Sequence, residues 1–140
     1  MIEPELIRRQ RVTEATLDRF RGNRFDWAAG RTCAHLAKWQ ARAMGHKLPS
    51  VPRFRSAIGA RRAIAALGAA SLIEVFDGLL PPIAPAAMLL GDLAAAEGEG
   101  GLDGMVVCAG PGKVMGWHRD AETFTIIDIG PADLSAAWRL

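Results

Sequence analysis

A cysteine that directly follows a hydroxyl side chain is the position in this chain best suited to covalent chemistry. Cys33 follows Thr32 and opens a run of helix-forming residues. Thr32 is a good N-cap, because its hydroxyl can accept a hydrogen bond from an unpaired backbone N–H of the first turn. The positive end of the helix dipole then favours the thiolate form of Cys33. The pattern predicts a thiol nucleophile, provided that a proton acceptor lies beside it.

The chain contains 3 histidines that could accept this proton. His35 lies two residues after Cys33 on the same expected helix, so it points away by about 200° at about 3.6 residues per turn. His46 lies beyond the end of that helix. His118 can approach the thiol only if its strand lies next to the start of the cysteine helix. His118 is therefore the candidate base, and it would need a third polar group to orient it.

The elements that must position these residues are predicted from periodicity and turn signals. Helices are expected over residues 3–21, 32–44, 56–67 and 71–76, with Ser56 as the cap of the third. Residues 46–52 and 79–85 contain closely spaced prolines and are expected to be irregular. Strands are expected over residues 91–97, 103–109, 113–118, 123–129 and 136–139. The chain is predicted to be a single α+β domain over 1–140, with N-terminal helices (1–78) packed on a small antiparallel sheet (86–140).

Apolar side chains at helical spacing predict which faces are buried. In the first helix we expect the core face to carry Leu6, Ile7, Gln10, Thr13, Leu17 and Phe20. In the third helix we expect it to carry Ile58, Ala60, Ile64 and Leu67. Cys108, inside an apolar strand, is expected in the core.

Composition excludes several classes of protein. Half of the 140 residues are hydrophobic, and no run of about 18 apolar residues without charges occurs, so no membrane span is expected. The charged N-terminus lacks the pattern of a secretory signal. The 2 cysteines form no metal-binding spacing, and we expect neither a metal nor a cofactor.

Charge is unevenly distributed along the chain. Residues 1–62 hold 14 Lys and Arg against 5 Asp and Glu, or +9, whereas residues 63–140 hold 3 against 10, or −7. The arginines are scattered along helices without interleaved aromatic residues, so nucleic acid is not expected as a partner. Attraction between the two halves is expected instead, within the chain or between subunits.

Tryptophans are the candidate contact residues. Trp117, beside His118 and Arg119, is the best candidate for an exposed contact, because such anchors concentrate binding energy. Trp27, Trp39 and Trp138 are expected to anchor either the core or an interface. The predicted interface residues are therefore Trp117, Arg119, Trp27 and Trp138.

Several short motifs, in a fixed order, resemble one family. They are Phe25-Asp26-Trp27 before the cysteine, Gly91-Asp92-Leu93 at a strand start, Gly104 within a strand, and Ala137-Trp138-Arg139. Together they resemble the NlpC-type cell-wall cysteine peptidases, and more closely a compact phage-encoded branch found among tail genes. The likeness runs from Phe25 to Trp138 and implies a papain-like fold.

The resemblance implies roles for single residues. Cys33 would be the nucleophile, although the family usually has an aspartate where this chain has Thr32. The family's base is a histidine in a His-Val-Gly-Ile-like sequence, and here Leu102 stands in its place. Asp103 follows but should point to the opposite face of the strand. The third polar residue has no clear counterpart, with His118 and Asp128 as the candidates.

Because leucine cannot accept a proton, the resemblance implies a structural or assembly component of a tailed-phage virion. It would belong to the tail or tail tip, contact other tail proteins, and be made in the host cytoplasm. The alternative is an active cysteine peptidase or amidase that cleaves peptidoglycan stem peptides during phage entry, with Cys33 as nucleophile and His118 as a displaced base. A small cytosolic adaptor is a third hypothesis.

Overall fold

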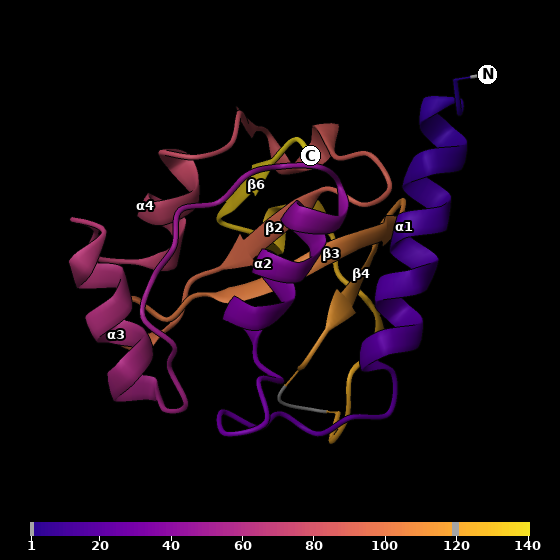
Figure 1. The fold of residues 1–140 in the computed structure, drawn as a ribbon. Helices are drawn as coiled ribbons and strands as arrows, with labels where there is room; N and C mark the ends of the chain where they lie inside the picture. The colour runs from indigo at the N-terminus through magenta and orange to yellow at the C-terminus, as the bar shows by residue number, and fades with distance from the viewer. Residues whose placement is uncertain (1, 119–120) are drawn as a thin grey trace.

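The computed structural model describes residues 2–118 and 121–140, and its fold is α+β, as predicted (Figure 1). The helices are α1 (Glu5–Phe20), α2 (Cys33–Ala43), α3 (Ala57–Ala66) and α4 (Leu72–Asp77). The strands are β1 (Pro82–Ile83), β2 (Leu93–Ala96), β3 (Gly104–Gly110), β4 (Lys113–Gly116), β5 (Thr125–Asp128) and β6 (Ala136–Trp138). Three short 3₁₀ turns complete it: η1 (Pro85–Ala87), η2 (Glu99–Gly101) and η3 (Pro131–Asp133).

The strands form one antiparallel sheet in the order β1-β6-β2-β3-β4-β5. Figure 1 shows α2 lying across one face of this sheet, with α1 at one side and α3 and α4 at the other. The closest helix–sheet packing is between α2 and β3, and α1 packs on α2. The start of α2, which carries Cys33, is thereby held against the central strands.

Alternation along the strands divides the apolar residues between two layers. Leu93, Met105 and Met115 face α2 and join the main core, together with Phe20, Leu36 and Trp138. Their neighbours Ala94, Val106 and Val114 face the other side, where they cluster with Ala137 of the adjacent strand β6 and with Leu134. The central strands are therefore buried on both faces, as the run Met-Val-Val-Cys-Ala predicts.

Local capping explains where the helices begin. The Thr32 side chain accepts a hydrogen bond from the His35 backbone N–H, at 3.4 Å, and Ser56 accepts one from Gly59, at 3.0 Å. Each satisfies a donor that has no partner within the helix. Both predicted caps are confirmed.

The buried face of α1 differs from the predicted one. Leu6, Ile7 and Gln10 are exposed. Thr13 and Phe20 are buried as predicted, and Arg9, Val12 and Thr16 face inward with them. The apolar pattern misplaced the face because an arginine occupies a core position, where a buried carboxylate pairs with it. In α3, Ile58 and Leu67 are likewise exposed rather than inward, while Ala60 and Ile64 are buried as expected.

The strand β1 lies within the segment predicted to be irregular. Its two residues pair with Trp138 and Ala137 of β6 at the edge of the sheet. Proline lacks a backbone N–H and is tolerated at such an edge, so a Pro-rich sequence conceals the strand. None of the helices in the described part of the chain has the length and hydropathy needed to cross a bilayer.

Candidate functional site

Cys33 and His118 line the same open pocket, at the start of α2 and just beyond the end of β4. The pocket has a volume of about 250 Å³, and its other walls are Phe25, Trp117, Ala121 and Glu122. His118 can act on the thiol only if it lies near the start of α2, and the structure places both residues in the lining of one pocket. At that volume the pocket is smaller than typical small-molecule sites of roughly 300–1,000 Å³.

A short turn and a buried hydroxyl fix the position of Cys33. Asp26 and Arg31 exchange two backbone hydrogen bonds, at 2.8 and 2.9 Å, and so close the turn that leads into α2. Thr32 is fully buried, and its hydroxyl lies 2.7 Å from His35 Nδ1. Cys33 is thus the first residue of α2 and is held on the side facing the pocket.

Backbone pairing brings the His118 side of the pocket to the Cys33 side. The Asn23 carbonyl accepts hydrogen bonds from the Trp117 indole N–H and from the Phe124 backbone N–H, both at 2.9 Å. Arg24 and Thr123 form an isolated antiparallel bridge. The segment before α2 is therefore tied to the segments that flank residues 119–120, which places His118 opposite Cys33.

Electrostatics at Cys33 oppose ionisation. The half-buried thiol packs against the main core, and burial raises its pKa above the ordinary value for cysteine. Backbone N–H groups of Met105 and of Cys33 itself act in the opposite direction and are outweighed. The helix start alone therefore does not produce the activated thiolate that the sequence pattern suggests.

The residues beside the expected base serve the fold. Leu102 is half-buried and packs against the main core. Asp103 is buried, and its carboxylate accepts hydrogen bonds from the backbone N–H groups of Ile73, in the first turn of α4, at 3.0 Å, and of Gly98, at 3.4 Å. Asp103 therefore ties the start of α4 to the segment before β3, and it does not line the pocket with Cys33.

Two predicted contact residues form the aromatic surroundings of the pocket. Trp117 is half-buried and lies edge-to-face with Phe25, at 5.8 Å between ring centroids, and with Phe20, at 5.7 Å. Trp27 also packs edge-to-face with Phe25, at 5.6 Å between ring centroids. Phe25 itself is 44% exposed, so this cluster offers an apolar surface next to the thiol.

Two other predicted contact residues do not contribute to that surface. Trp138 is fully buried in the main core, and its indole N–H donates to Asp77 Oδ1 at 2.9 Å. It therefore anchors the core, which was one of its two expected roles, and its prediction as an interface residue is wrong. Arg119 lies outside the described residues.

The remaining candidates have structural roles. His35 faces Phe54, at 4.7 Å between ring centroids, and does not line the Cys33 pocket, as its helical position predicts. Cys108 is buried, and its thiol donates to the Gly110 carbonyl at 3.6 Å. Within residues 2–118 and 121–140, no group of three or more His, Cys, Asp or Glu side chains is arranged to hold a metal ion.

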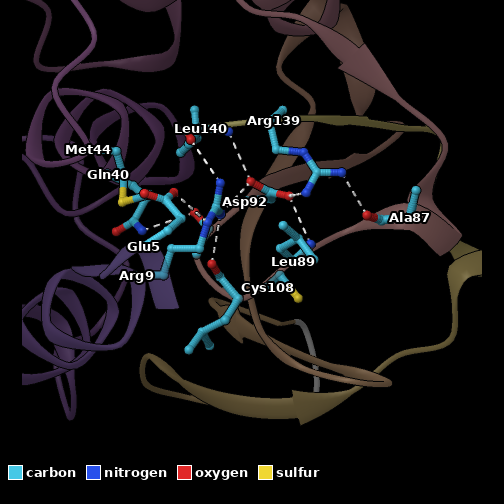
Figure 2. Close-up of polar contacts among 12 residues, drawn as sticks. Glu5, Arg9, Gln40, Met44, Ala87, Leu89, Asp92, Cys108, Arg139 and Leu140 are labelled. Atoms are coloured by element: carbon cyan, nitrogen blue, oxygen red, sulfur yellow. Dashed lines mark hydrogen bonds and ion pairs between the residues drawn. The ribbon is translucent and has the colours of Figure 1, made fainter. Parts of the chain in front are cut away.

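The Gly91-Asp92-Leu93 motif forms a buried polar junction (Figure 2). Asp92 Oδ1 accepts hydrogen bonds from Arg9 Nη1 and from the Leu140 backbone N–H, both at 2.9 Å. Asp92 Oδ2 accepts one from the Leu89 backbone N–H, at 2.8 Å, and lies 3.3 Å from Arg139 Nη1. One carboxylate thus joins α1, the start of β2 and the residues after β6.

The glycine of the motif permits a close approach of helices to the sheet. Gly91 has a φ of +90°, and a Cβ at this position would lie 2.8 Å from Thr13 Oγ1. The Gly91 carbonyl accepts a hydrogen bond from Gln40 Nε2, at 3.0 Å, and Gln40 Oε1 accepts one from the Thr16 hydroxyl, at 2.6 Å. The motif therefore fixes α1 and α2 over the sheet.

Sequence reasoning missed two features of the site. Glu122 lines the Cys33 pocket and pairs with Arg24 at 3.6 Å, but no spacing or motif singled it out. Arg9, which is not part of the predicted core face of the first helix, is buried. The charge difference between the two halves of the chain was the available signal, because the Arg9–Asp92 and Arg24–Glu122 pairs both join the basic half to the acidic half.

A comparison with protein families gives one match. The family described as "Domain of unknown function (DUF6950)" matches residues 6–140. The chain belongs to this family. No curated protein and no solved structure matches it. In this DUF6950 chain the matched region contains both the Cys33 pocket and the Asp92 junction.

Proposed function

We propose that this chain is a non-catalytic structural or assembly component of a tailed-phage virion, in the tail or tail tip. The observation that carries the proposal is the state of Cys33. Its thiol occupies the nucleophile position at a helix start, yet burial raises its pKa instead of lowering it. At the position where the NlpC-type resemblance expects the base, Leu102 packs into the core.

The arrangement of elements supports a scaffold derived from that family. A helix opening with cysteine packs on the central strand of an antiparallel sheet, and a Gly-Asp-Leu strand lies beside it. Phe25, Trp27 and Trp117 present apolar and aromatic surface beside the thiol, and side chains of this kind are enriched at protein interfaces. Other tail proteins are the proposed partners, in line with the phage branch that the motifs resemble.

Hydrolysis of peptidoglycan and the protein composition of purified phage particles test the proposal together. The purified chain should release no product from labelled peptidoglycan stem peptides, and Cys33→Ala should leave particle assembly intact. Mass spectrometry of purified particles should detect the chain among the tail proteins. Hydrolysis that Cys33→Ala abolishes, or absence of the chain from the particles, would contradict the proposal.

A second candidate is a cysteine peptidase or amidase acting on peptidoglycan stem peptides, and the shared pocket of Cys33 and His118 favours it. In that reaction His118 takes the Cys33 proton while the sulfur attacks the amide carbonyl. The protonated His118 then gives its proton to the leaving amine, and water hydrolyses the thioester to restore the thiol.

His118→Asn separates the two candidates. If the chain is a hydrolase, this variant should lose about 10²–10⁴-fold in rate, because general acid–base assistance contributes that much. If the chain is a scaffold, neither His118→Asn nor Cys33→Ala changes the background rate. Circular dichroism of both variants serves as the control for folding.

A further inference from the structure

A basic groove lies between the end of α1 and the outer face of α2. We define it by Arg19, Lys38, Trp39 and Arg42, and its other lining residues are Phe20, Gly30 and His35. Trp39 is 37% exposed, and the Arg19 guanidinium carbon lies 3.8 Å above its ring centroid. This is a cation–π contact between Arg19 and the indole.

Like charges are held together in this groove. Burial lowers the Lys38 pKa, and the charges of Arg42 and of Arg53, in the segment after α2, lower it further. Lys38 Nζ also lies 5.5 Å from the Phe54 ring, so its side chain is directed along the protein surface. Such a cluster of cations costs free energy unless an anion is bound.

None of these cations is neutralised within the part of the chain that the structure describes. The ion pairs there involve other residues, and no carboxylate lies within 4.0 Å of Arg19, Lys38, Arg42 or Arg53. By contrast, Arg8 and Arg11 on the same helix α1 each pair with a glutamate. The groove therefore carries an uncompensated positive charge beside an exposed indole.

A second copy of this chain is poorly matched to the groove. Although residues 63–140 are acidic overall, most of the acidic side chains described there are already engaged. Asp92 and Asp103 are buried, Glu122 and Asp128 have ion pairs, and Glu74 and Asp77 accept hydrogen bonds. A partner protein of different sequence is therefore the better-matched source of the anion.

A protein segment fits the groove better than a nucleic acid does. Single-stranded nucleic acids bind along tracks of successive aromatic rings, and here one indole is exposed and Arg19 covers one of its faces. The cations surround one hollow instead of forming a continuous stripe. Carboxylates beside an apolar side chain would match the cations and the indole together.

We infer that the basic groove of Arg19, Lys38, Trp39 and Arg42 is a docking site for an acidic segment of a partner protein, with glutamate or aspartate next to an apolar side chain. The inference does not rest on the proposed virion role. Bidentate pairing of a carboxylate with Arg19 or Arg42 would fix its orientation. The attraction is expected to weaken with salt, since screening shortens from about 10 Å at 0.1 M to about 3 Å at 1 M.

Fluorescence anisotropy with three labelled probes tests the inference on the full chain. The probes are a peptide in which glutamates flank a phenylalanine, the same peptide with glutamine for glutamate, and an oligothymidylate of equal charge. The glutamate peptide should bind most tightly, and the Lys38→Glu/Arg42→Glu variant should weaken it by about tenfold or more, since like charges oppose docking.

A charge-matched variant makes the test specific. Arg55→Glu/Arg62→Glu changes the net charge equally at exposed positions outside the groove and should alter binding by less than about threefold. Thermal melting confirms that both variants fold. Tighter binding of the oligothymidylate, equal loss in both double variants, or no binding of the glutamate peptide would each overturn the inference.

Discussion

The guanidinium of Arg9 lies 2.9 Å from Asp92 Oδ1, and both side chains are almost completely shielded from solvent, at 4% and 0% exposure. Arg9 also donates to the carbonyls of Leu90, at 2.9 Å, and Leu140, at 3.0 Å. A buried ion pair of this kind is stable only when its remaining donors and acceptors are satisfied. Here backbone groups of Leu89 and Leu140 complete the carboxylate.

Replacing Asp92 should therefore be severely destabilising. Asp92→Asn leaves the buried Arg9 cation with only the exposed Glu5 carboxylate, at 3.0 Å, and loss of one partner of a buried ion pair costs about 3–5 kcal/mol. Urea unfolding followed by circular dichroism measures the free energy of unfolding. Asp128→Asn, which breaks the exposed pair with Lys113 at 2.7 Å, is the control and should leave stability nearly unchanged. Equal effects of the two substitutions would contradict the role assigned to Asp92.

Gly91→Ala should destabilise the chain by more than the cost of its backbone conformation. A left-handed alanine costs about 1–2 kcal/mol, and the added Cβ at 2.8 Å from Thr13 Oγ1 forces a further shift. Gly22→Ala is the control, because Gly22 has a φ of +77° and nothing within 4 Å of its Cβ position. The difference between the two melting temperatures measures the steric part.

Thr13 provides the complementary variant. Its buried hydroxyl has no hydrogen-bond partner among the described residues, so Thr13→Ala should cost little. Combined with Gly91→Ala, it should recover the steric part of the loss and leave the backbone part. A double variant no more stable than Gly91→Ala alone would show that the Gly91–Thr13 contact is not the cause.

These residues also show why sequence reasoning succeeded for most elements and failed for the buried face of α1. Helix starts were predictable because the side chains of Thr32 and Ser56 accept hydrogen bonds from backbone N–H groups only three residues away. The strands of β3 and β4 follow from β-branched and apolar runs around a Gly-Pro-Gly turn. The burial of Arg9 depends on Asp92, 83 residues later, and no local pattern contains that partner.

The parts of the Cys33 pocket that depend on local sequence were likewise predictable, and those that depend on long-range pairing were not. Cys33 at a helix start followed from local signals, and so did the orientation of His35 away from it. The proximity of His118 and Glu122 to Cys33 depends on how the segment before α2 pairs with residues near Phe124. Such long-range pairing sets the pocket, and single-sequence patterns do not encode it.

The thiol of Cys33 should react slowly at neutral pH. Because burial raises its pKa, the rate of alkylation by iodoacetamide should reach its midpoint above the value of about 8.5 for a free cysteine. A Cys108→Ser background isolates the signal, since the second thiol is buried and its pKa is also raised. A midpoint below 8.5 would indicate an activated thiolate and would favour the hydrolase over the scaffold.

The same shift predicts how stability depends on pH. A raised pKa in the folded state means that the folded chain holds the Cys33 proton more tightly than the unfolded chain. The contribution of Cys33 to the free energy of unfolding is therefore fully present below the unfolded-state pKa of about 8.5. It is lost as the pH rises from there through the folded-state pKa. Cys33→Ala should flatten the decline in unfolding free energy over this alkaline range.

His35 should titrate below its ordinary range. Burial lowers its pKa first, and the Lys38 charge lowers it further, while Thr32 holds Nδ1 at 2.7 Å. The folded state thus prefers neutral His35, so its contribution to stability is present above about pH 6.5 and is lost as the pH falls through the folded-state pKa. NMR titration of the His35 ring protons, assigned with His35→Gln, measures this value.

Two variants separate the causes of the shift. Lys38→Gln should raise the His35 pKa in part, whereas Arg62→Gln, at an exposed position on α3, should not. A glutamate peptide bound in the basic groove should also raise it, and a His35 pKa at or above 6.5 in the free chain would contradict the burial that the structure assigns to this ring.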